Sequence, residues 1–283
     1  MPEYTAAEFV ETAIDTVQKS GGGGSDWILH HIMDGRELDF EPFFTLHIPQ
    51  LPLIFGIDMT PTKHVVFMWL AALLMLIIFS LVASAYKKSL VPTKLANFFE
   101  VLIIFVRDEI AKPTIGTGYD KYVPYLLTLF FFILFGNFLG LVPWSATFTS
   151  NIAVTAALAL FSFFMIQFSG IKQNGLIGYF KGLVPHGIPI LLLPLMVLVE
   201  VLGLFTKPFA LTIRLFANMV AGHTVILALL GLIFFMGTIF VAPVSVLFAL
   251  FIYVLEILVA LIQAYIFAML TSLFIGMAVH QEH

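Results

Sequence analysis

The sequence predicts an all-α integral membrane protein with about five or six membrane helices. These include one amphipathic helix on the cytoplasmic surface and two long, strongly tilted helices at the C-terminal end. Of the 283 residues, 60% are hydrophobic and only 11% are charged, and the mean hydropathy is +1.05. Soluble domains carry about 25% charged residues, because polar side chains must cover their surface. Apolar stretches that reach the length of one membrane crossing, about 20 residues, recur along the chain.

Charge balance and cysteine content exclude several classes of function. The chain has 13 Lys and Arg residues against 17 Asp and Glu residues, so no basic surplus favours a nucleic-acid partner. It has no cysteine, which excludes disulfides, a thiol nucleophile and a cysteine-bound metal. Together with the low charge content, this excludes soluble enzymes and nucleic-acid-binding proteins.

Residues 1–61 are predicted to form an acidic extramembrane extension, and residues 62–283 the membrane domain. The first 60 residues hold ten acidic and two basic side chains, a net charge of −8. Four prolines between residues 41 and 62 rule out a long helix in that stretch. Residues 21–25, Gly-Gly-Gly-Gly-Ser, are typical of a flexible linker.

The first predicted crossing is residues 65–86, which are apolar over about the length that one span needs. Lys87 and Lys88 follow it directly, and Lys94 comes soon after. Because basic residues concentrate in cytoplasmic loops, this end is expected in the cytoplasm and the N-terminus outside.

Residues 93–112 predict a helix on the cytoplasmic membrane surface rather than a crossing. Charged residues crowd both ends and leave about a dozen apolar residues between them, too few to span. At about 100° per residue, the apolar residues share one side of this helix, and Glu100 and Arg107 lie on the opposite side. That apolar side comprises Phe98, Val101, Leu102 and Phe105. Such a helix is typical of one that lies in the membrane interface.

Two further crossings are predicted in the charge-free stretch 122–171. Residues 125–141 would lead outward and residues 152–168 back to the cytoplasm, with a turn at the prolyl and polar residues between them. The polar, glycine-containing residues 172–185 are expected to form a cytoplasmic loop.

Residues 186–279 contain only four charged side chains. A break near residues 236–243 divides them into two segments, each longer than the usual span of about 20 residues, which implies strong tilting. The C-terminus is then cytoplasmic. The four charged residues are Glu200, Lys207, Arg214 and Glu256.

Arg214 is the hardest of these charges to explain within the chain. A charge at the bilayer centre costs about 2.5–3.5 kcal/mol on insertion scales, and guanidinium does not deprotonate in proteins. No acidic residue lies within four positions of Arg214, and Glu200 is fourteen residues away, about 21 Å along a helix. The neutralising carboxylate must come from Glu256, as a structural ion pair, or from another protein.

Helical periodicity arranges the other polar residues around Arg214. Glu200, Lys207 and Asn218 fall within about 40° of it and form a polar stripe. Lys207 alternatively snorkels or pairs loosely with Glu200. Since the segment enters from the cytoplasmic side, Glu200 is expected inward of Arg214.

His223 lies about 180° from Arg214 on the same predicted helix and further outward. Glu256 and Gln263 share one face of the last helix, with Glu256 outward and Gln263 near the level of Arg214. His223 and Glu256 are both able to exchange a proton near neutral pH, which makes them a candidate proton-accepting pair. His223 as a satisfied buried histidine remains the alternative, as does interhelical hydrogen bonding for Asn218 and Gln263.

Three runs together resemble subunit a of the membrane (Fo) sector of F-type ATP synthases. Residues 214–223 read Arg-Leu-Phe-Ala-Asn-Met-Val-Ala-Gly-His, and residues 261–267 read Leu-Ile-Gln-Ala-Tyr-Ile-Phe. Residues 137–143, Asn-Phe-Leu-Gly-Leu-Val-Pro, resemble that family's motif at the end of an earlier crossing. The resemblance covers about residues 60–283 and is most specific around Arg214.

The resemblance implies a non-catalytic subunit without a cofactor, which translocates H⁺, or in some members Na⁺, past a rotating c-ring. Arg214 would be the essential arginine between two offset half-channels. Asn218, His223, Glu256 and Gln263 match polar positions of the access path, and Glu200 matches an acid of the cytoplasmic exit path.

The implied partners are the c-ring, the b subunits of the peripheral stalk and the lipid bilayer of an energy-coupling membrane, such as the bacterial inner membrane. One departure from the family is informative. Some members place an acid at the position of His223 and a histidine at that of Glu256. The exchange suggests that the two positions are close in space and share one protonatable role.

Two other classes of protein compete with this interpretation. A secondary transporter also has intramembrane charges, but it usually contains inverted repeats, and none is detectable here. An intramembrane enzyme or haem protein needs a nucleophile with a base, or paired axial histidines. His186 and His223 are too isolated in the sequence to form such a set.

Overall fold

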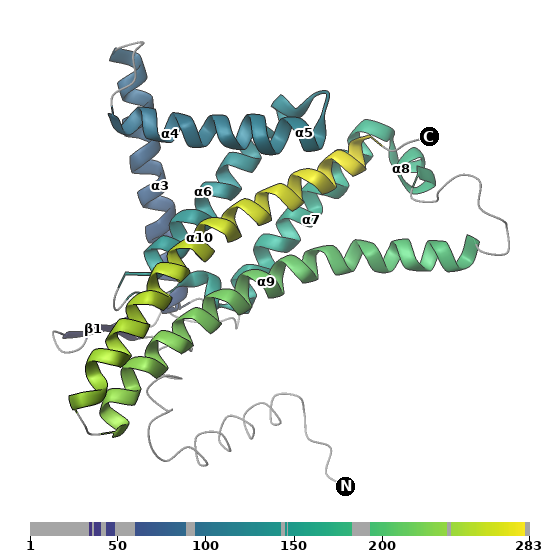
Figure 1. The fold of residues 1–283 in the computed structure, drawn as a ribbon. Coiled ribbons are helices and arrows are strands. Elements are labelled where there is room, and N and C mark those ends of the chain that lie inside the picture. Colours follow the sequence, from purple (N-terminus) through teal and green to yellow (C-terminus); the bar gives the residue numbers. More distant parts are fainter. Residues whose placement is uncertain are drawn as a thin grey trace, which may run out of the picture. The chain divides into compact units, whose positions relative to one another are not determined.

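The computed structural model describes residues 34–35, 37–40, 44–48, 60–88, 94–142, 145, 147–182, 193–236 and 239–280. The predicted linker at residues 21–25 and His186 lie outside these residues. Figure 1 shows the fold. Its elements in chain order are β1 (Glu37–Phe40), β2 (Phe44–His47), α3 (Lys63–Lys88), α4 (Lys94–Phe105), the π-helix η1 (Val106–Ala111), α5 (Lys112–Ile115), the 3-10 helix η2 (Tyr119–Lys121), α6 (Val123–Gly140), the 3-10 helix η3 (Phe148–Ser150), α7 (Ile152–Asn174), α8 (Leu176–Gly182), α9 (Leu193–Met236), the 3-10 helix η4 (Ile239–Val241) and α10 (Ala242–Val279).

The chain divides into two compact units. The larger unit comprises His64–Met219 and Ile257–His283, and the smaller unit comprises Met1–Lys63 and Val220–Glu256. The long helices α9 and α10 each contribute residues to both units.

Among the described residues, five helices are long and apolar enough to cross a membrane, which confirms the predicted all-α membrane protein. They are Lys63–Lys87, Val123–Gly140, Ile152–Asn174, Pro194–Ile233 and Ala242–Val279. The last two lie in helices of 44 and 38 residues. At 1.5 Å per residue these helices are about 66 and 57 Å long, nearly twice the bilayer core of about 30 Å. Their length agrees with the predicted tilt.

A short hairpin in the smaller unit was not predicted. β1 and β2 pair in antiparallel register, with Glu37 opposite His47 and Phe40 opposite Phe44. Both strands alternate polar and apolar residues, the period of two that an extended strand has. The prolines that exclude a long helix nearby do not exclude such short strands.

The predicted surface helix is present as α4, η1 and α5, and none of these is a candidate for spanning. Figure 1 shows α4 running across the direction of α3 and α6. The predicted apolar face of α4 stays largely exposed: Phe98 and Val101 are each 60% exposed. A second apolar face, which includes Ala96 and Phe99, is buried instead. The exposed face is thus free for lipid, as a surface helix requires.

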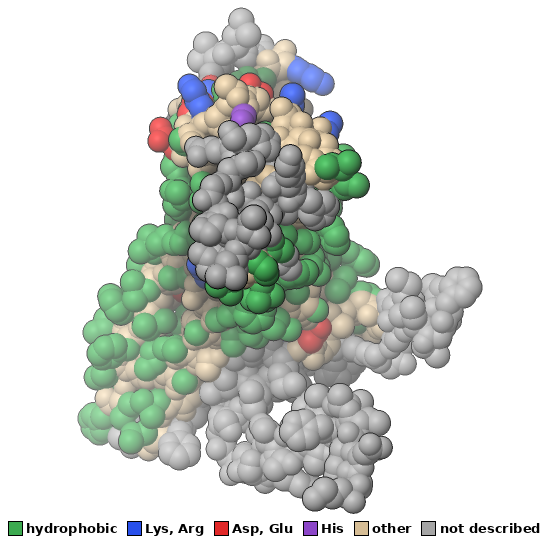
Figure 2. All heavy atoms as spheres, turned by 90° about the vertical axis from the view of Figure 1, so that its right-hand side faces the viewer, with side chains coloured by type: hydrophobic (Ala, Val, Ile, Leu, Met, Phe, Trp, Pro, Cys, Tyr) green, Lys and Arg blue, Asp and Glu red, His purple; other side chains and the backbone are tan. Residues whose placement is uncertain are grey.

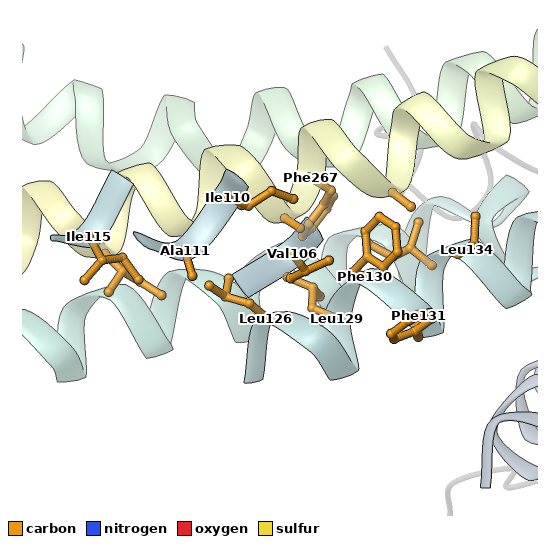
Figure 3. Packing of buried hydrophobic residues seen from close by; sticks show 14 of the residues in the cluster. Val106, Ile110, Ala111, Ile115, Leu126, Leu129, Phe130, Phe131, Leu134 and Phe267 are labelled. Carbon is orange, nitrogen blue, oxygen red and sulfur yellow. The ribbon is translucent and has the colours of Figure 1, made fainter. Parts of the chain in front are cut away.

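The buried face of α4 continues along the π-helix η1, which packs against α6 and α10. Figure 3 shows Val106, Ile110 and Ala111 pointing toward side chains of α6 and toward Phe267 of α10. A π-helix adds a residue to one turn and therefore shifts the buried face along the helix. This core fixes the C-terminal half of α10 within the larger unit.

A short helix, α8, lies within the stretch that was predicted to be a polar loop. Gly175 ends α7 with a φ of 73°, a conformation that side chains with a Cβ rarely adopt. Tyr179 of α8 is buried against Gly170, where an added Cβ would lie only 2.4 Å from the tyrosine ring. The prediction of an irregular loop was therefore wrong for residues 176–182, because this packing holds them as a helix.

Candidate functional site

All six predicted site residues lie on the two long helices. Glu200, Arg214, Asn218 and His223 are on α9, and Glu256 and Gln263 are on α10. Both helices are apolar over most of their length, so each polar side chain is conspicuous. His223 and Glu256 belong to the smaller unit, and the other four belong to the larger one.

Arg214 lies on an exposed side of α9. Its neighbours Leu211 and Leu215 are 3% and 1% exposed, and they anchor the adjacent side of α9 in the core of the larger unit. Ala210 and Ala217, within about 60° of Arg214, are exposed like the arginine. Among the described residues of its own unit, Arg214 makes no hydrogen bond or ion pair. A charged group is thus presented on the surface of an apolar helix, with the small side chains of Ala210 and Ala217 on its exposed flank.

Glu200 and Lys207 line one cavity of about 380 Å³ in the larger unit. No ion pair joins them in the part of the chain that the structure describes. The ammonium of Lys207 instead lies 5.0 Å from the ring centroid of Phe274, close enough for a cation–π interaction. The loose pairing of Lys207 with Glu200, one of the two alternatives, is not observed.

Asn218 is half-buried and Gln263 is 6% exposed. Neither side chain forms a hydrogen bond with another described residue of the larger unit. Interhelical hydrogen bonding, which was the alternative role for both, is therefore not seen there. Both amides keep their donors and acceptors available.

His223 and Glu256 are in direct contact. Nδ1 of His223 lies 2.6 Å from Oε1 of Glu256, so a hydrogen bond joins a ring nitrogen to a carboxylate oxygen. The Glu256 side chain is 2% exposed and that of His223 22%. The spatial proximity that the exchange of residue types suggested is observed, and the protonatable role stays a prediction.

Two features set the position of the Glu256 carboxylate. A Cβ at Gly222 would lie 2.7 Å from Oε1, so the glycine leaves room for the carboxylate to reach His223. The other oxygen, Oε2, is buried and has no hydrogen-bond partner among the described residues. An unpaired buried carboxylate oxygen is costly, and it is a ready acceptor for a proton.

Sequence reasoning missed three polar residues of the cavity beside Glu200, one of which is His280 after the end of α10. Gln167 of α7 and Tyr179 of α8 both line it, and the Tyr179 hydroxyl donates a hydrogen bond of 2.6 Å to Oε1 of Gln167. Between Ile152 and Ile171, α7 has no charged residue, and Gln167 is its only amide side chain. This isolated amide could have been recognised from the sequence as a candidate site residue. No sequence feature placed Tyr179 there, because the loop prediction hid its helix.

A second buried amide, Asn137, belongs to the motif at the end of α6. It accepts a hydrogen bond of 2.8 Å from the Thr149 hydroxyl, and its Nδ2 lies 3.4 Å from the carbonyl oxygen of Ala260. Asn137 is fully buried. It therefore ties α6 and η3 to α10, three residues from Gln263.

Charged residues outside the membrane-length helices include an exposed pair on η1, Arg107 and Asp108, in which each charge has a partner. Figure 2 shows red and blue side chains gathered near its top, above hydrophobic ones. On η1, the hydrogen bonds from Arg107 hold the pKa of the Asp108 carboxyl below its ordinary value of 3.8, and this pair is solvent-exposed. The two opposite charges of Arg107 and Asp108 neutralise each other at the surface.

Known proteins place this chain in a family. The family model described as "ATP synthase A chain" matches residues 65–276, a range that includes every predicted site residue. ATP synthase subunit a of Chloroherpeton thalassium is 54% identical over 259 residues, which cover 90% of this chain and 77% of that protein. ATP synthase subunit a of Pelodictyon phaeoclathratiforme is 49% identical over 286 residues, covering 98% and 84%.

A further relative, ATP synthase subunit a of an Anaeromyxobacter species, is 52% identical over 281 residues, which cover 92% of this chain and 67% of that protein. The family match covers more than half of the chain, and these relatives extend it to almost the whole length. The chain belongs to the ATP synthase A chain family.

Proposed function

We propose that this chain is the ion-translocating stator subunit of a rotary ATP synthase. It provides two offset proton half-channels to a rotating c-ring, and Arg214 separates them. Family membership supports the general assignment. The assignment of two half-channels separated by an arginine depends on Arg214. This cation is exposed on an apolar helix, and it has no ion pair among the described residues of its unit.

Arg214 would act on a carboxyl group of the ring. A fixed cation stabilises the ionised form of a nearby carboxyl, so a ring carboxyl that reaches Arg214 releases its proton and is attracted. A carboxylate in lipid would cost about 2.5–3.5 kcal/mol, so the group must be protonated again before it turns into the bilayer. The guanidinium also repels a proton that would pass directly between the half-channels.

The small side chains beside Arg214 support the same mechanism. Ala210 and Ala217 are exposed on its side of α9. Small residues let two membrane helices approach closely, so a ring helix could bring its carboxyl to the guanidinium. Bulky side chains at these positions would hold the two charges apart.

The access half-channel would contain His223 and Glu256, with Asn218 and Gln263 as further polar positions. In this proposal, Oε2 of Glu256 takes up the incoming proton, because it is buried and unpaired among the described residues. A histidine nitrogen bound to a carboxylate favours H⁺ over Na⁺, since hard cations prefer sets of oxygen ligands. The exit half-channel would contain Glu200 and its cavity.

The chain itself would be non-catalytic, with neither a cofactor nor a metal. The lysines after α3 favour an outer N-terminus and a cytoplasmic C-terminus in an energy-coupling membrane such as the bacterial inner membrane. Residues 1–61 would form an extramembrane extension beside the membrane domain of residues 62–283. The c-ring and the b subunits of the peripheral stalk would be its protein partners.

The proposal is tested by replacing Arg214 with Ala in the assembled synthase. ATP synthesis driven by a proton gradient in membrane vesicles should fall by about 100-fold or more, since the loss of one preorganised charge costs that much. Thr206→Ala is the matched control. Thr206 is exposed on α9, and its hydroxyl donates a hydrogen bond to the Gly203 carbonyl of the same helix.

Thr206→Ala should synthesise ATP at the wild-type rate, and both variants should yield normal amounts of complex. Coupled ATP synthesis retained in Arg214→Ala would refute the proposed role. The measurement separates a loss of ion coupling from a loss of assembly, because the complex is quantified in the same vesicles.

A further inference from the structure

The cavity beside Glu200 contains more polar groups than the proposed mechanism uses. Its wall is built by α7, α8, α9 and α10, all within the larger unit. With about 380 Å³, it has room for several water molecules, each of which occupies about 30 Å³ in the liquid. Glu200 and Lys207 come from α9, whereas Gln167 and Tyr179 come from the two elements that face it.

The two polar atoms of the Gln167 amide differ in their surroundings: the oxygen is hydrogen-bonded, and the nitrogen has no partner among the described residues. Its Oε1 accepts the hydrogen bond of 2.6 Å from the Tyr179 hydroxyl. Its Nε2 is enclosed and has no hydrogen-bond partner among the described residues. Buried N–H groups are almost always satisfied by protein or by ordered water. The described residues supply no partner for this donor, and the cavity that Gln167 lines has space for a water.

Tyr179 is held in a position that orients the glutamine. Its ring packs over Gly170, where a Cβ would lie 2.4 Å from the ring, and the residue is 2% exposed. Burial raises the pKa of the phenol above 10.0, and the bond to Gln167 opposes this. Tyr179 therefore stays a neutral donor at physiological pH, and Nε2 of Gln167 is kept on the free side of the amide.

We propose that Gln167, oriented by Tyr179, binds a water in this cavity that passes protons between the Glu200 carboxyl and the aqueous mouth of the exit half-channel. The inference rests on the proposed function. A proton leaves the Glu200 carboxyl to the water, and the water gives a proton to the next water toward the cytoplasm. The next proton released by a ring carboxyl returns the Glu200 carboxylate to its neutral form. Gln167 and Tyr179 are positioning residues that do not titrate in this step.

The test compares two glutamines of α7. Gln167→Leu removes the donor and keeps a similar volume, whereas Gln173→Leu makes the same change at an exposed position of the same helix. In vesicles that hold the whole synthase, Gln167→Leu should lower ATP-driven proton pumping about fivefold or more at normal amounts of complex. Gln173→Leu should pump like the wild type.

Gln167→His, which restores an N–H donor, should recover at least about half of the lost rate, as a packing defect would not. Tyr179→Phe keeps the ring and removes the hydroxyl, so it should lower the rate less than Gln167→Leu. If Gln167→Leu does not assemble, Tyr179→Phe decides: a reduced rate at normal assembly supports the inference, and an unchanged rate overturns it.

Pumping within twofold of wild type in Gln167→Leu, or a loss that Gln167→His does not restore, overturns the inference. These results leave the proposed function intact as long as Arg214→Ala abolishes coupled synthesis. Retained coupling in Arg214→Ala would refute the proposed function instead, so the two failures are distinguishable.

Discussion

Two arginines of the larger unit have opposite electrostatic surroundings. Arg107 on η1 forms two hydrogen bonds of 2.9 Å to the carboxylate of Asp108, the next residue. Arg214 on α9 is also exposed, but it lies in an apolar helix and has no ion pair among the described residues of that unit. The first charge is satisfied locally, and the second requires a carboxylate from elsewhere. In the proposed function, the missing partner, more than the charge itself, distinguishes Arg214 from Arg107.

Glu256 offers an intermediate case, because it has a local partner and is buried. This predicts that His223 and Glu256 can be exchanged, whereas Arg214 cannot be replaced. His223→Glu and Glu256→His alone should each lower proton-driven ATP synthesis about tenfold or more, the usual scale for losing a proton-transfer group. The double variant should retain more activity than either single one, since the pair is rebuilt. Equal losses in all three variants would contradict a shared role.

The next prediction concerns the space that Gly222 leaves for Glu256. In Gly222→Ala the new Cβ would lie 2.7 Å from Oε1, so the carboxylate must move away from His223. Proton-driven ATP synthesis should fall about fivefold at normal assembly, because small misplacements of a reacting group are costly. Gly203→Ala on the same helix has no atom within 4 Å of its Cβ and should leave the rate unchanged.

Shortening the acid should relieve the crowding that Gly222→Ala creates. The double variant Gly222→Ala with Glu256→Asp should therefore be more active than Gly222→Ala alone. Both glycine changes raise helix propensity by about 1 kcal/mol, so a difference between them cannot come from the backbone. Equal rates for Gly222→Ala and Gly203→Ala would show that the position of the carboxylate does not matter.

The smallest effect is expected at Arg107. Arg107→Ala should keep ATP synthesis within about twofold of wild type, because exposed ion pairs contribute little. The pair lowers the pKa of Asp108, so its small stabilisation is present above the ordinary value of 3.8 and is lost as the pH falls through the folded-state value. Thermal unfolding of the detergent-solubilised chain should therefore differ slightly between variant and wild type near pH 7 and converge below pH 3.8. A strong loss of coupling in Arg107→Ala would break the comparison.

Much of the fold follows from length and hydropathy. The spans α3, α6 and α7 were predictable because each is an apolar run bounded by polar or turn residues. The two long helices followed from the scarcity of charges after residue 186. These features depend on how favourably a whole segment transfers into lipid. The hydropathy of the segment alone determines this, without knowledge of the rest of the chain.

Features that depend on packing between distant segments were not predictable. Helix α8 exists because Tyr179 packs at Gly170, and the buried face of α4 depends on its contacts with α3 and α6. The contact of His223 with Glu256 was suggested by their shared proton chemistry and by the family resemblance, not by any pattern of packing. Gln167 escaped notice because a single amide in an apolar span gains meaning only beside Tyr179 and a cavity.

The most direct test of the account is an experimental structure of the assembled synthase that resolves the side chain of Arg214. The distance from its guanidinium to the nearest carboxylate decides where the missing partner lies. The account predicts a carboxylate of the c-ring within about 4 Å, or separated from the guanidinium by a single water. An ion pair between Arg214 and Glu256 of the same chain, with no ring carboxylate nearby, would contradict it.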